Sequence, residues 1–331
     1  MKVFVTTGCG NIIQGGADMW TNNFIELVLP YLTDYYILVD SKRPVGWEDT
    51  YELEKCNKLH FHGNSPEKTE EILEKCNEIH FIHANYHKRE HLWKWKEKWG
   101  TIFVQAYLPD MLEYGDSLRQ FNTSVVEEDV EELLTHCKKR IWIGNNQSQI
   151  FSKFETETIT NFYEFKQNKE LNKINNKLGF TSRIESRKNV HYLDGLPSYV
   201  LSGYYDWKNI SENGSFDFSK VRYFQWDIAI LESFMKLSWT ISHSCHTKEP
   251  FGYSIFQAVD WGKLPILHSD WGDVQYRYRA SNKEEFKQIY ELILSDNREV
   301  HLEEFNRLKK YLKKFDNKNI WKESVKNLFV S

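Results

Sequence analysis

The sequence predicts an α/β fold made of two Rossmann-like, doubly wound domains that face a central cleft. Short apolar runs alternate with stretches of helical periodicity along most of the chain, as in such domains. The length of 331 residues exceeds what one hydrophobic core usually holds. A polar segment at 152–177 separates two such series, so we expect an N-terminal domain at 1–165 and a C-terminal domain at 166–310. A last helix at 311–331 could pack back on the first domain.

Strands and helices alternate in the first domain. Helical spacing of apolar residues predicts a helix at 22–32. Two similar segments, 53–61 and 73–81, each predict the end of a helix, an Asn cap and a strand. Two copies suit a doubly wound sheet better than a solenoid, which needs more repeats. Apolar runs predict the other strands, at 3–5, 36–39, 102–104 and 141–143.

The second domain continues the alternation. Ligands of doubly wound folds bind at the carboxyl ends of the strands, so the loops after these strands are where a site is expected. The predicted strands are 178–180, 199–201, 239–242 and 266–267. The predicted helices are 190–196, 228–234, 283–296 and 301–328, together with one after residue 252.

The composition excludes some classes of protein and favours one compartment. The formal charge of −4 carries no general nucleic-acid signature, so any site for a polyanion must be local. No apolar run is long enough to span a bilayer. The start of the chain has the pattern of a strand that leads into a glycine loop, and not that of a signal peptide. Five cysteines without paired spacing therefore favour reduced thiols and a cytoplasmic location.

A glycine-rich loop follows the first predicted strand and ends in Gly15 and Gly16. Glycine allows backbone N–H groups to approach a phosphate at a helix N-terminus. Such turns are also common without a ligand, and this one has neither the dinucleotide spacing nor a Gly-Lys-Ser/Thr phosphate loop. Gly15 and Gly16 are candidate phosphate contacts, with a plain strand-to-helix turn as the alternative.

Two cations follow the strand expected at 178–180. Arg183 and Lys188 lie in the polar segment that ends at Asn189. An arginine supplies a planar fork of donors and a lysine supplies a point charge, and together they suit a diphosphate. The alternative is a solvated basic loop, and Arg187 is the alternative cation.

The segment from Glu249 to Pro265 is the most informative part of the chain. Glu249 comes just before a Phe-Gly turn, and an apolar helical run and a Gly-Lys-Leu-Pro break follow. A turn that opens a helix presents free backbone N–H groups, which suit an anionic or hydroxyl-rich ligand. The carboxylate of Glu249 can accept hydrogen bonds from sugar hydroxyls. The alternative is an ordinary helix N-terminus with a buried face.

Two side chains of the first domain could activate an acceptor hydroxyl. His83 and Asp110 each follow an apolar run, at the place where a strand would end. Either could take a proton from a hydroxyl group. The alternatives are a structural histidine and an aspartate that caps a helix.

Residues 87–99 interleave three tryptophans with five Lys or Arg residues and two acids. Cations can hold phosphates while aromatic rings stack on bases, so this segment is a candidate nucleic-acid site. The alternative is an amphipathic helix that packs Trp93 on the sheet and leaves its lysines in water. The candidate cations are Lys88, Arg89, Lys94 and Lys96.

The spacing from Arg183 and Lys188 through Glu249 to Pro265 resembles the donor site of the retaining nucleotide-sugar glycosyltransferases of family four, which have the GT-B fold. The family motif is an acid, seven residues and a second acid, and Gln257 occupies the second place here. The resemblance implies that Arg183 and Lys188 bind the donor diphosphate, and that Gln257 binds the ribose through an amide. The residues implied to hold the sugar are Glu249, Phe251, Gly252 and Tyr253.

Two positions depart from the pattern of that family. Asn189 stands where the family usually has glycine, although asparagine still tolerates a left-handed turn. Tyr107 stands near the place of a histidine that faces the donor sugar in the family. His83 closes a segment that resembles a family strand ending in histidine.

Within this family, the C-terminal half is most similar to the DNA alpha-glucosyltransferases of T-even-type phages. The similarity lies in the loop with Arg183 and Lys188, in the run from Phe256 to Pro265, and in the last helices. It implies transfer of a sugar from a UDP-sugar to 5-hydroxymethylcytosine in double-stranded DNA, with retention of configuration, in the cytoplasm of an infected host. It implies no tightly bound cofactor and no metal, because the cations take the place of a metal.

Two other functions fit the same residues. A family-four enzyme that builds a glycan or a small glycoside would act on sugar acceptors and ignore DNA. A non-catalytic nucleotide-sugar binder, suggested by Gln257 and Tyr107, would bind the donor without turnover.

Overall fold

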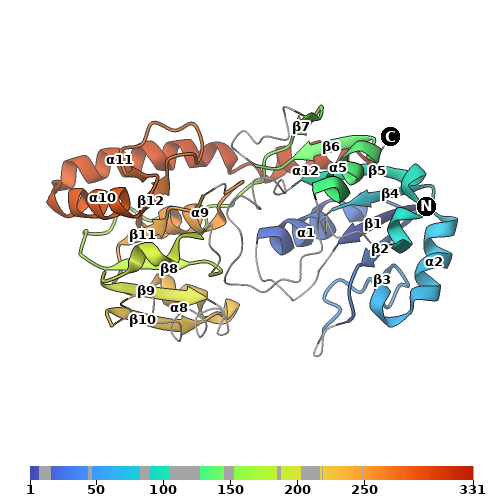
Figure 1. The fold of residues 1–331 in the computed structure, drawn as a ribbon, viewed down its shortest axis with the longest axis horizontal. Coiled ribbons are helices and arrows are strands. Elements are labelled where there is room, and N and C mark those ends of the chain that lie inside the picture. Colours follow the sequence, from blue (N-terminus) through green and yellow to red (C-terminus); the bar gives the residue numbers. More distant parts are fainter. Residues whose placement is uncertain are drawn as a thin grey trace. The chain divides into compact units, whose positions relative to one another are not determined.

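The computed structural model describes residues 1–6, 16–43, 47–82, 90–104, 127–144, 153–184, 188–202, 217, 219–247 and 249–330. The described residues up to Asn161 and from Lys318 onward form one compact unit, and those from Phe162 to Asn317 form a second. Each unit contains a parallel sheet with helices around it, which is the predicted α/β class (Figure 1). No helix in these ranges is both long and apolar enough to cross a membrane.

The first sheet has seven parallel strands in the order β3-β2-β1-β4-β5-β6-β7. Its central strands are almost continuously apolar, as expected of a parallel sheet that is covered on both faces. All six residues of β5 are buried. The strands are β1 (Lys2–Thr6), β2 (Tyr35–Val39), β3 (Leu59–Phe61), β4 (Glu78–Phe81), β5 (Trp99–Val104), β6 (Lys139–Trp142) and β7 (Glu157–Thr158).

The helices of the first unit lie between these strands in the sequence, except α12, which follows the second unit. Ser65 caps the start of one of them, because its hydroxyl accepts a hydrogen bond from the backbone N–H of Lys68 and Pro66 occupies the first turn. The α-helices are α1 (Gly16–Leu27), α2 (Pro66–Lys75), α3 (Glu90–Trp93), α5 (Glu127–His136) and α12 (Lys318–Lys326). The short 3-10 turns are η1 (Leu29–Tyr31), η2 (His62–Asn64) and η3 (Lys96–Lys98).

Helix α12 completes the core of the first unit, although it lies at the far end of the sequence (Figure 1). The ring of Trp321 stands edge-on to that of Trp20, with centroids 5.5 Å apart. Phe329, just after the helix, packs edge-on against Phe4 of β1 at 5.1 Å. The Nζ of Lys2 also donates a hydrogen bond to the carbonyl oxygen of Phe329. Both ends of the sequence therefore build one hydrophobic core.

The second sheet has six parallel strands in the order β10-β9-β8-β11-β12-β13. Strand β8 lies between β9 and β11, so the chain winds away from β8 in both directions, and the same reversal occurs at β1 in the first sheet. Ligands of doubly wound sheets bind at such a switch point. The strands are β8 (Leu178–Thr181), β9 (Ser198–Ser202), β10 (Val221–Gln225), β11 (Ile241–Ser244), β12 (Leu264–His268) and β13 (Arg279–Ala280).

The helices of the second unit begin at polar caps or glycine. The side chains of Asp227, Asn282 and Asn297 each accept a hydrogen bond from a backbone N–H in the first turn of the helix that they precede. The elements are α8 (Ile228–Met235), α9 (Tyr253–Asp260), α10 (Lys283–Ser295), α11 (Arg298–Leu312), and the 3-10 turns η5 (Val190–Leu193) and η6 (Lys313–Phe315).

Two predicted helices of the first unit differ from the structure. The helix expected at 22–32 starts at Gly16 and ends at Leu27, because Pro30 disfavours continued α-helix in the residues before it. Residues 51–57 form turns and not the end of a helix. The carboxylate of Asp49 accepts hydrogen bonds from the backbone N–H groups of Leu53, Glu54 and Lys55, which fixes the turn.

Shifts in the second unit are smaller. The strand expected at 239–242 is β11, two residues later, and the helix expected at 190–196 is the short turn η5. The long helix expected at 301–328 is interrupted, because α11 ends at Leu312 and α12 starts at Lys318. Three strands, the five-residue β10 and the two-residue β7 and β13, have no counterpart among the predicted elements.

Gly262 explains why the Gly-Lys-Leu-Pro break needs glycine. Its φ of +70° lies in the left-handed region, and a Cβ there would lie 2.1 Å from the carbonyl oxygen of Glu170. That oxygen belongs to backbone and cannot swing away as a flexible side chain could.

We expect Gly262→Ala to lower the free energy of unfolding by about 2–4 kcal/mol, because backbone strain and a steric overlap add. Gly195→Ala is the matched control, since Gly195 has a φ of +73° with nothing within 4 Å of an added Cβ. It should lose only about 1 kcal/mol from its left-handed backbone. Urea unfolding of both variants measures the difference, and equal losses would show that the approach to Glu170 costs nothing.

Candidate functional site

The loops after β8 and β11 meet at the switch point of the second sheet. β8 ends at Thr181 and its loop contains Lys188, while β11 ends at Ser244 and is followed by Glu249. The two strands are direct neighbours, so the predicted donor residues from both loops come together at one edge.

Lys188 and Glu249 form an ion pair at this edge. The Nζ of Lys188 donates a hydrogen bond to Oε2 of Glu249. Their side chains are 9% and 13% exposed, so the pair is largely removed from water. A charge in such a place is not screened as a surface charge is, which makes it effective toward an anionic ligand. The structure thus brings together the cation and the acid that the sequence pattern selected separately.

Two buried histidines, one in β11 and one in the loop after it, contact Glu249 or the residue next to Lys188. Nδ1 of His246 lies 3.5 Å from Oε2 of Glu249, and the ring is almost fully buried. Burial lowers the pKa of His243 to about 3, so this ring is neutral near pH 7. Its Nε2 therefore donates to the carbonyl oxygen of Asn189 at 2.8 Å, while Nδ1 accepts from the backbone N–H of Cys245 at 3.3 Å. Neither histidine was predicted from the sequence.

The start of helix α9 has the geometry predicted for the Phe-Gly turn. Gly252 is the N-cap residue with a φ of +81°, and an added Cβ would lie 2.8 Å from Cδ1 of Ile255. The carbonyl oxygen of Phe251 accepts a hydrogen bond from Nε1 of Trp271 at 3.1 Å, which fixes the turn. Tyr253 and Gln257, four residues apart, lie on one face of the helix, and both are half-buried.

Arg183 lies in the loop after β8, two residues beyond the end of the strand, and its side chain is exposed. The alternative cation Arg187 lies outside the described residues. In the first unit, Gly16 is the first residue of α1, as a phosphate contact at a helix N-terminus requires. Several other proposed residues of that unit lie outside the described ranges: Gly15, His83, Lys88, Arg89 and Asp110, together with Tyr107.

Lys94 and Lys96 are engaged by acids. Lys94 pairs with Glu70 at 2.8 Å and Lys96 with Glu132 at 2.5 Å. The helix expected across this segment is only the short α3, because the chain then makes a 3-10 turn and enters β5 at Trp99. Ion pairs of this kind must be broken or shared before these lysines could contact phosphates.

Trp93 and Trp99 are both buried and pack edge-on with centroids 5.0 Å apart. Nε1 of Trp93 donates to Oε2 of Glu132. These two rings therefore belong to the core of the first unit and cannot stack on nucleic-acid bases.

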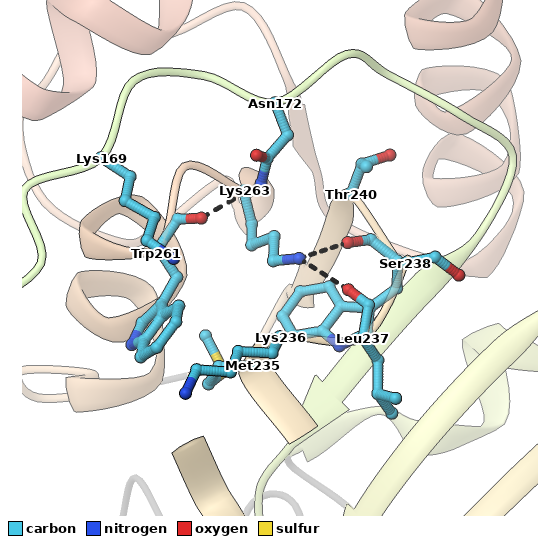
Figure 2. Close-up of a pocket in the computed structure, with 10 residues that line it drawn as sticks. Lys169, Asn172, Met235, Lys236, Leu237, Ser238, Thr240, Trp261 and Lys263 are labelled. Atoms are coloured by element: carbon cyan, nitrogen blue, oxygen red, sulfur yellow. Dashed lines mark hydrogen bonds between the residues drawn. The ribbon is translucent and has the colours of Figure 1, made fainter. Parts of the chain in front are cut away.

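A pocket of about 300 Å³ lies at the opposite, amino-terminal edge of the second sheet (Figure 2). Its lysines support the fold. Nζ of Lys263 donates to the carbonyl oxygens of Leu237 and Trp239, just before β11, and Lys236 pairs with Glu232. Helices α8 and α9 end beside this pocket, and the bonds of Lys263 fix the segment that leads from α8 into β11. The candidate site is therefore the carboxyl edge and not this pocket.

The structure is similar to solved glycosyltransferases over its whole length. Sucrose-phosphate synthase from Thermosynechococcus elongatus matches with a TM-score of 0.69 at 11% identity, over 99% of this chain and 98% of that chain. WaaG, a glycosyltransferase involved in lipopolysaccharide biosynthesis, matches with a TM-score of 0.66 at 11% identity, over 100% of both chains. An alpha-glucosyltransferase in complex with UDP and a 13-mer DNA containing a HMU base matches with a TM-score of 0.60 at 10% identity, over 100% of this chain and 99% of that chain.

These similarities establish the fold: the chain has the two-sheet GT-B architecture of these glycosyltransferases, as predicted. No family model matches the sequence, and no curated protein matches it. Within the described part of the chain, no three His, Cys, Asp or Glu side chains are grouped as a metal site needs.

The residues missed by the sequence analysis are polar groups of β11 and its loop. His243 in β11, and Cys245, His246 and Thr247 in the loop after it, are all buried. The alternation of Ser and His in β11 was the available signal, because polar side chains at the end of a buried strand need partners.

Proposed function

We propose that the protein is a retaining glycosyltransferase that uses a UDP-sugar as donor. The Lys188–Glu249 pair at the switch point of the second sheet is the observation that carries this proposal. It places a buried cation and an acid side by side, next to the N-terminus of α9. The solved alpha-glucosyltransferase of the same fold, which is in complex with UDP, supports a nucleotide-sugar donor.

Each residue has a proposed task in the reaction. Lys188 and Arg183 stabilise the negative charge that develops on the departing diphosphate, and this charge is largest in the transition state. Glu249 and the turn at Phe251, Gly252 and Tyr253 hold the sugar by hydrogen bonds. Gln257, one turn further along α9, holds the ribose through its side-chain amide. The acceptor hydroxyl replaces the diphosphate on the anomeric carbon, and its proton passes to a base.

The proposed acceptor is the hydroxyl group of 5-hydroxymethylcytosine in double-stranded DNA. The similarity of the C-terminal segments to phage DNA alpha-glucosyltransferases supports this choice. So does the solved structure of an alpha-glucosyltransferase with DNA that contains a HMU base, which aligns with this chain from end to end.

A sugar or glycan acceptor is the second candidate. Two observations favour it: Lys94 and Lys96 are neutralised by glutamates, and the net charge of the chain is negative. The solved sucrose-phosphate synthase and WaaG also have higher TM-scores than the alpha-glucosyltransferase.

Transfer of labelled sugar from a panel of UDP-sugars tests both acceptors. The protein is incubated with duplexes that contain 5-hydroxymethylcytosine, with unmodified duplexes, and with free sugars or sugar phosphates. We expect label on the modified duplex alone. Label on a sugar acceptor would support the second candidate instead. Donor binding without transfer or hydrolysis would contradict an enzyme and indicate a nucleotide-sugar binder.

A further inference from the structure

Asn189 connects the two loops that carry the ion pair. It directly follows Lys188, and it is 6% exposed. Its backbone is left-handed, with φ 55° and ψ 35°, a conformation that asparagine adopts more readily than most residues. The turn made by this residue ends the loop after β8 and starts η5.

Asn189 is hydrogen-bonded to β11 and to the loop that follows it. Nδ2 donates to the carbonyl oxygen of Cys245 at 2.9 Å and to Oγ1 of Thr247 at 3.0 Å. The main-chain oxygen of Asn189 accepts from Nε2 of His243 at 2.8 Å. An amide nitrogen has two N–H groups, and both have an acceptor here.

These bonds fix the residue after Lys188 to a point two residues before Glu249. Lysine has a long flexible side chain, so its ammonium is placed accurately only if its backbone is held. Charge stabilisation in a transition state needs this accuracy more than ground-state binding does, because the donors must already be in position when the charge develops.

We propose that Asn189 is a positioning residue for glycosyl transfer, which sets the place of Lys188 relative to Glu249 by bonding to Cys245 and Thr247 in the first part of the loop after β11. The proposal rests on the proposed function of the site. It assigns no contact with substrate to Asn189, which acts through Lys188.

Asn189→Gly tests the proposal, because glycine keeps the left-handed backbone and removes only the side-chain bonds. We expect kcat for UDP-sugar turnover to fall about 10- to 100-fold, as for other small misplacements of catalytic groups. The Kd for UDP should change by less than about threefold, because a flexible lysine still reaches a bound diphosphate. Thr247→Val, which removes one acceptor and leaves Asn189 in place, should give a smaller loss in the same direction.

Asn168→Gly is the matched control. Asn168 also has a left-handed backbone, with a φ of +47°, but it is exposed and lies before β8. It should keep wild-type kcat. Thermal unfolding of each variant identifies any that fail to fold, and Thr247→Val keeps the test valid if Asn189→Gly is one of them.

A double-mutant cycle with Lys188→Ala separates positioning from general structural support. If Asn189 acts through Lys188, adding Asn189→Gly to Lys188→Ala should lower single-turnover rates by less than about threefold. A full repeat of the single-variant loss in this background would overturn the proposal, as would wild-type kcat in Asn189→Gly. A wild-type protein without any UDP-sugar turnover would instead contradict the proposed function.

Discussion

Replacing Lys188 with alanine should lower kcat/KM for the UDP-sugar about 100- to 1000-fold, the loss typical of one removed electrostatic contact in a transition state. Lys188 is a largely buried cation of the candidate site, and in the proposed reaction it stabilises the charge of the departing diphosphate. Arg183 is exposed, whereas Lys188 is largely buried beside Glu249, and Arg187 lies outside the described residues. Steady-state kinetics with varied donor concentration measure the loss.

Lys220→Ala is the control for the loss of a lysine from the second unit. Lys220 is exposed and precedes β10, at the amino-terminal edge of the sheet and away from the site. Its replacement should leave kcat/KM unchanged. Lys188→Ala also removes the cation that pairs with the largely buried carboxylate of Glu249, which can destabilise the fold. The melting temperature of the Lys188→Ala protein must therefore be measured together with its activity. A folded Lys188→Ala protein with activity within tenfold of wild type would contradict the proposed role.

Replacing Glu249 with glutamine should separate UDP affinity from turnover, and the two should change in opposite directions. The ammonium of Lys188 donates a hydrogen bond to the carboxylate of Glu249, so a diphosphate that binds Lys188 must compete with that carboxylate. Glutamine removes the competing charge, and we expect the Kd for UDP to fall about fivefold, the size of a modest ion-pair contribution. Turnover should fall about 100-fold, because the sugar loses a charged hydrogen-bond acceptor.

Gln257→Ala provides the opposite case for the same measurements. Gln257 lies on α9, where it is proposed to hold the ribose, and it does not pair with Lys188. Its loss should weaken UDP binding, in contrast to the tighter UDP binding expected for Glu249→Gln. Isothermal titration with UDP gives both Kd values. Weaker UDP binding in Glu249→Gln would show that the carboxylate helps to hold the nucleotide and does not compete with it.

The fold could be predicted from the sequence because most strands and helices have a local pattern of apolar and polar residues that marks where they lie. The buried strands β1, β5, β8 and β12 are apolar runs, and the polar junction separated the two series. Short edge strands such as β7 and β13 have two residues each, too few for any periodicity to show. Residues 53–57 have the same sequence as residues 73–77, where helix α2 does end, so the sequence predicts a helix end at both places. The hydrogen bonds to Asp49 make the first segment a turn.

The candidate site was predicted only in part, for a physical reason. Glu249 and Lys188 have a recognisable spacing, and their contact follows from the neighbouring places of β8 and β11. The bonds of Asn189 to Cys245 and Thr247 have no counterpart in local sequence, because they join residues more than fifty positions apart. The alternation of Ser and His in β11 marks His243 as a polar residue of a buried strand, but the sequence does not show that the ring is neutral or that it bonds to Asn189.

The packing of α12 on the first unit also determines the order in which the protein can mature on the ribosome. Phe4 and Trp20 precede the whole second unit in the sequence, whereas Phe329 and Trp321, which pack against them, follow it. The second unit, from Phe162 to Asn317, is complete in the nascent chain before these residues appear. The first unit therefore cannot be completed until the whole second unit has been synthesised, and its aromatic core stays uncovered until then.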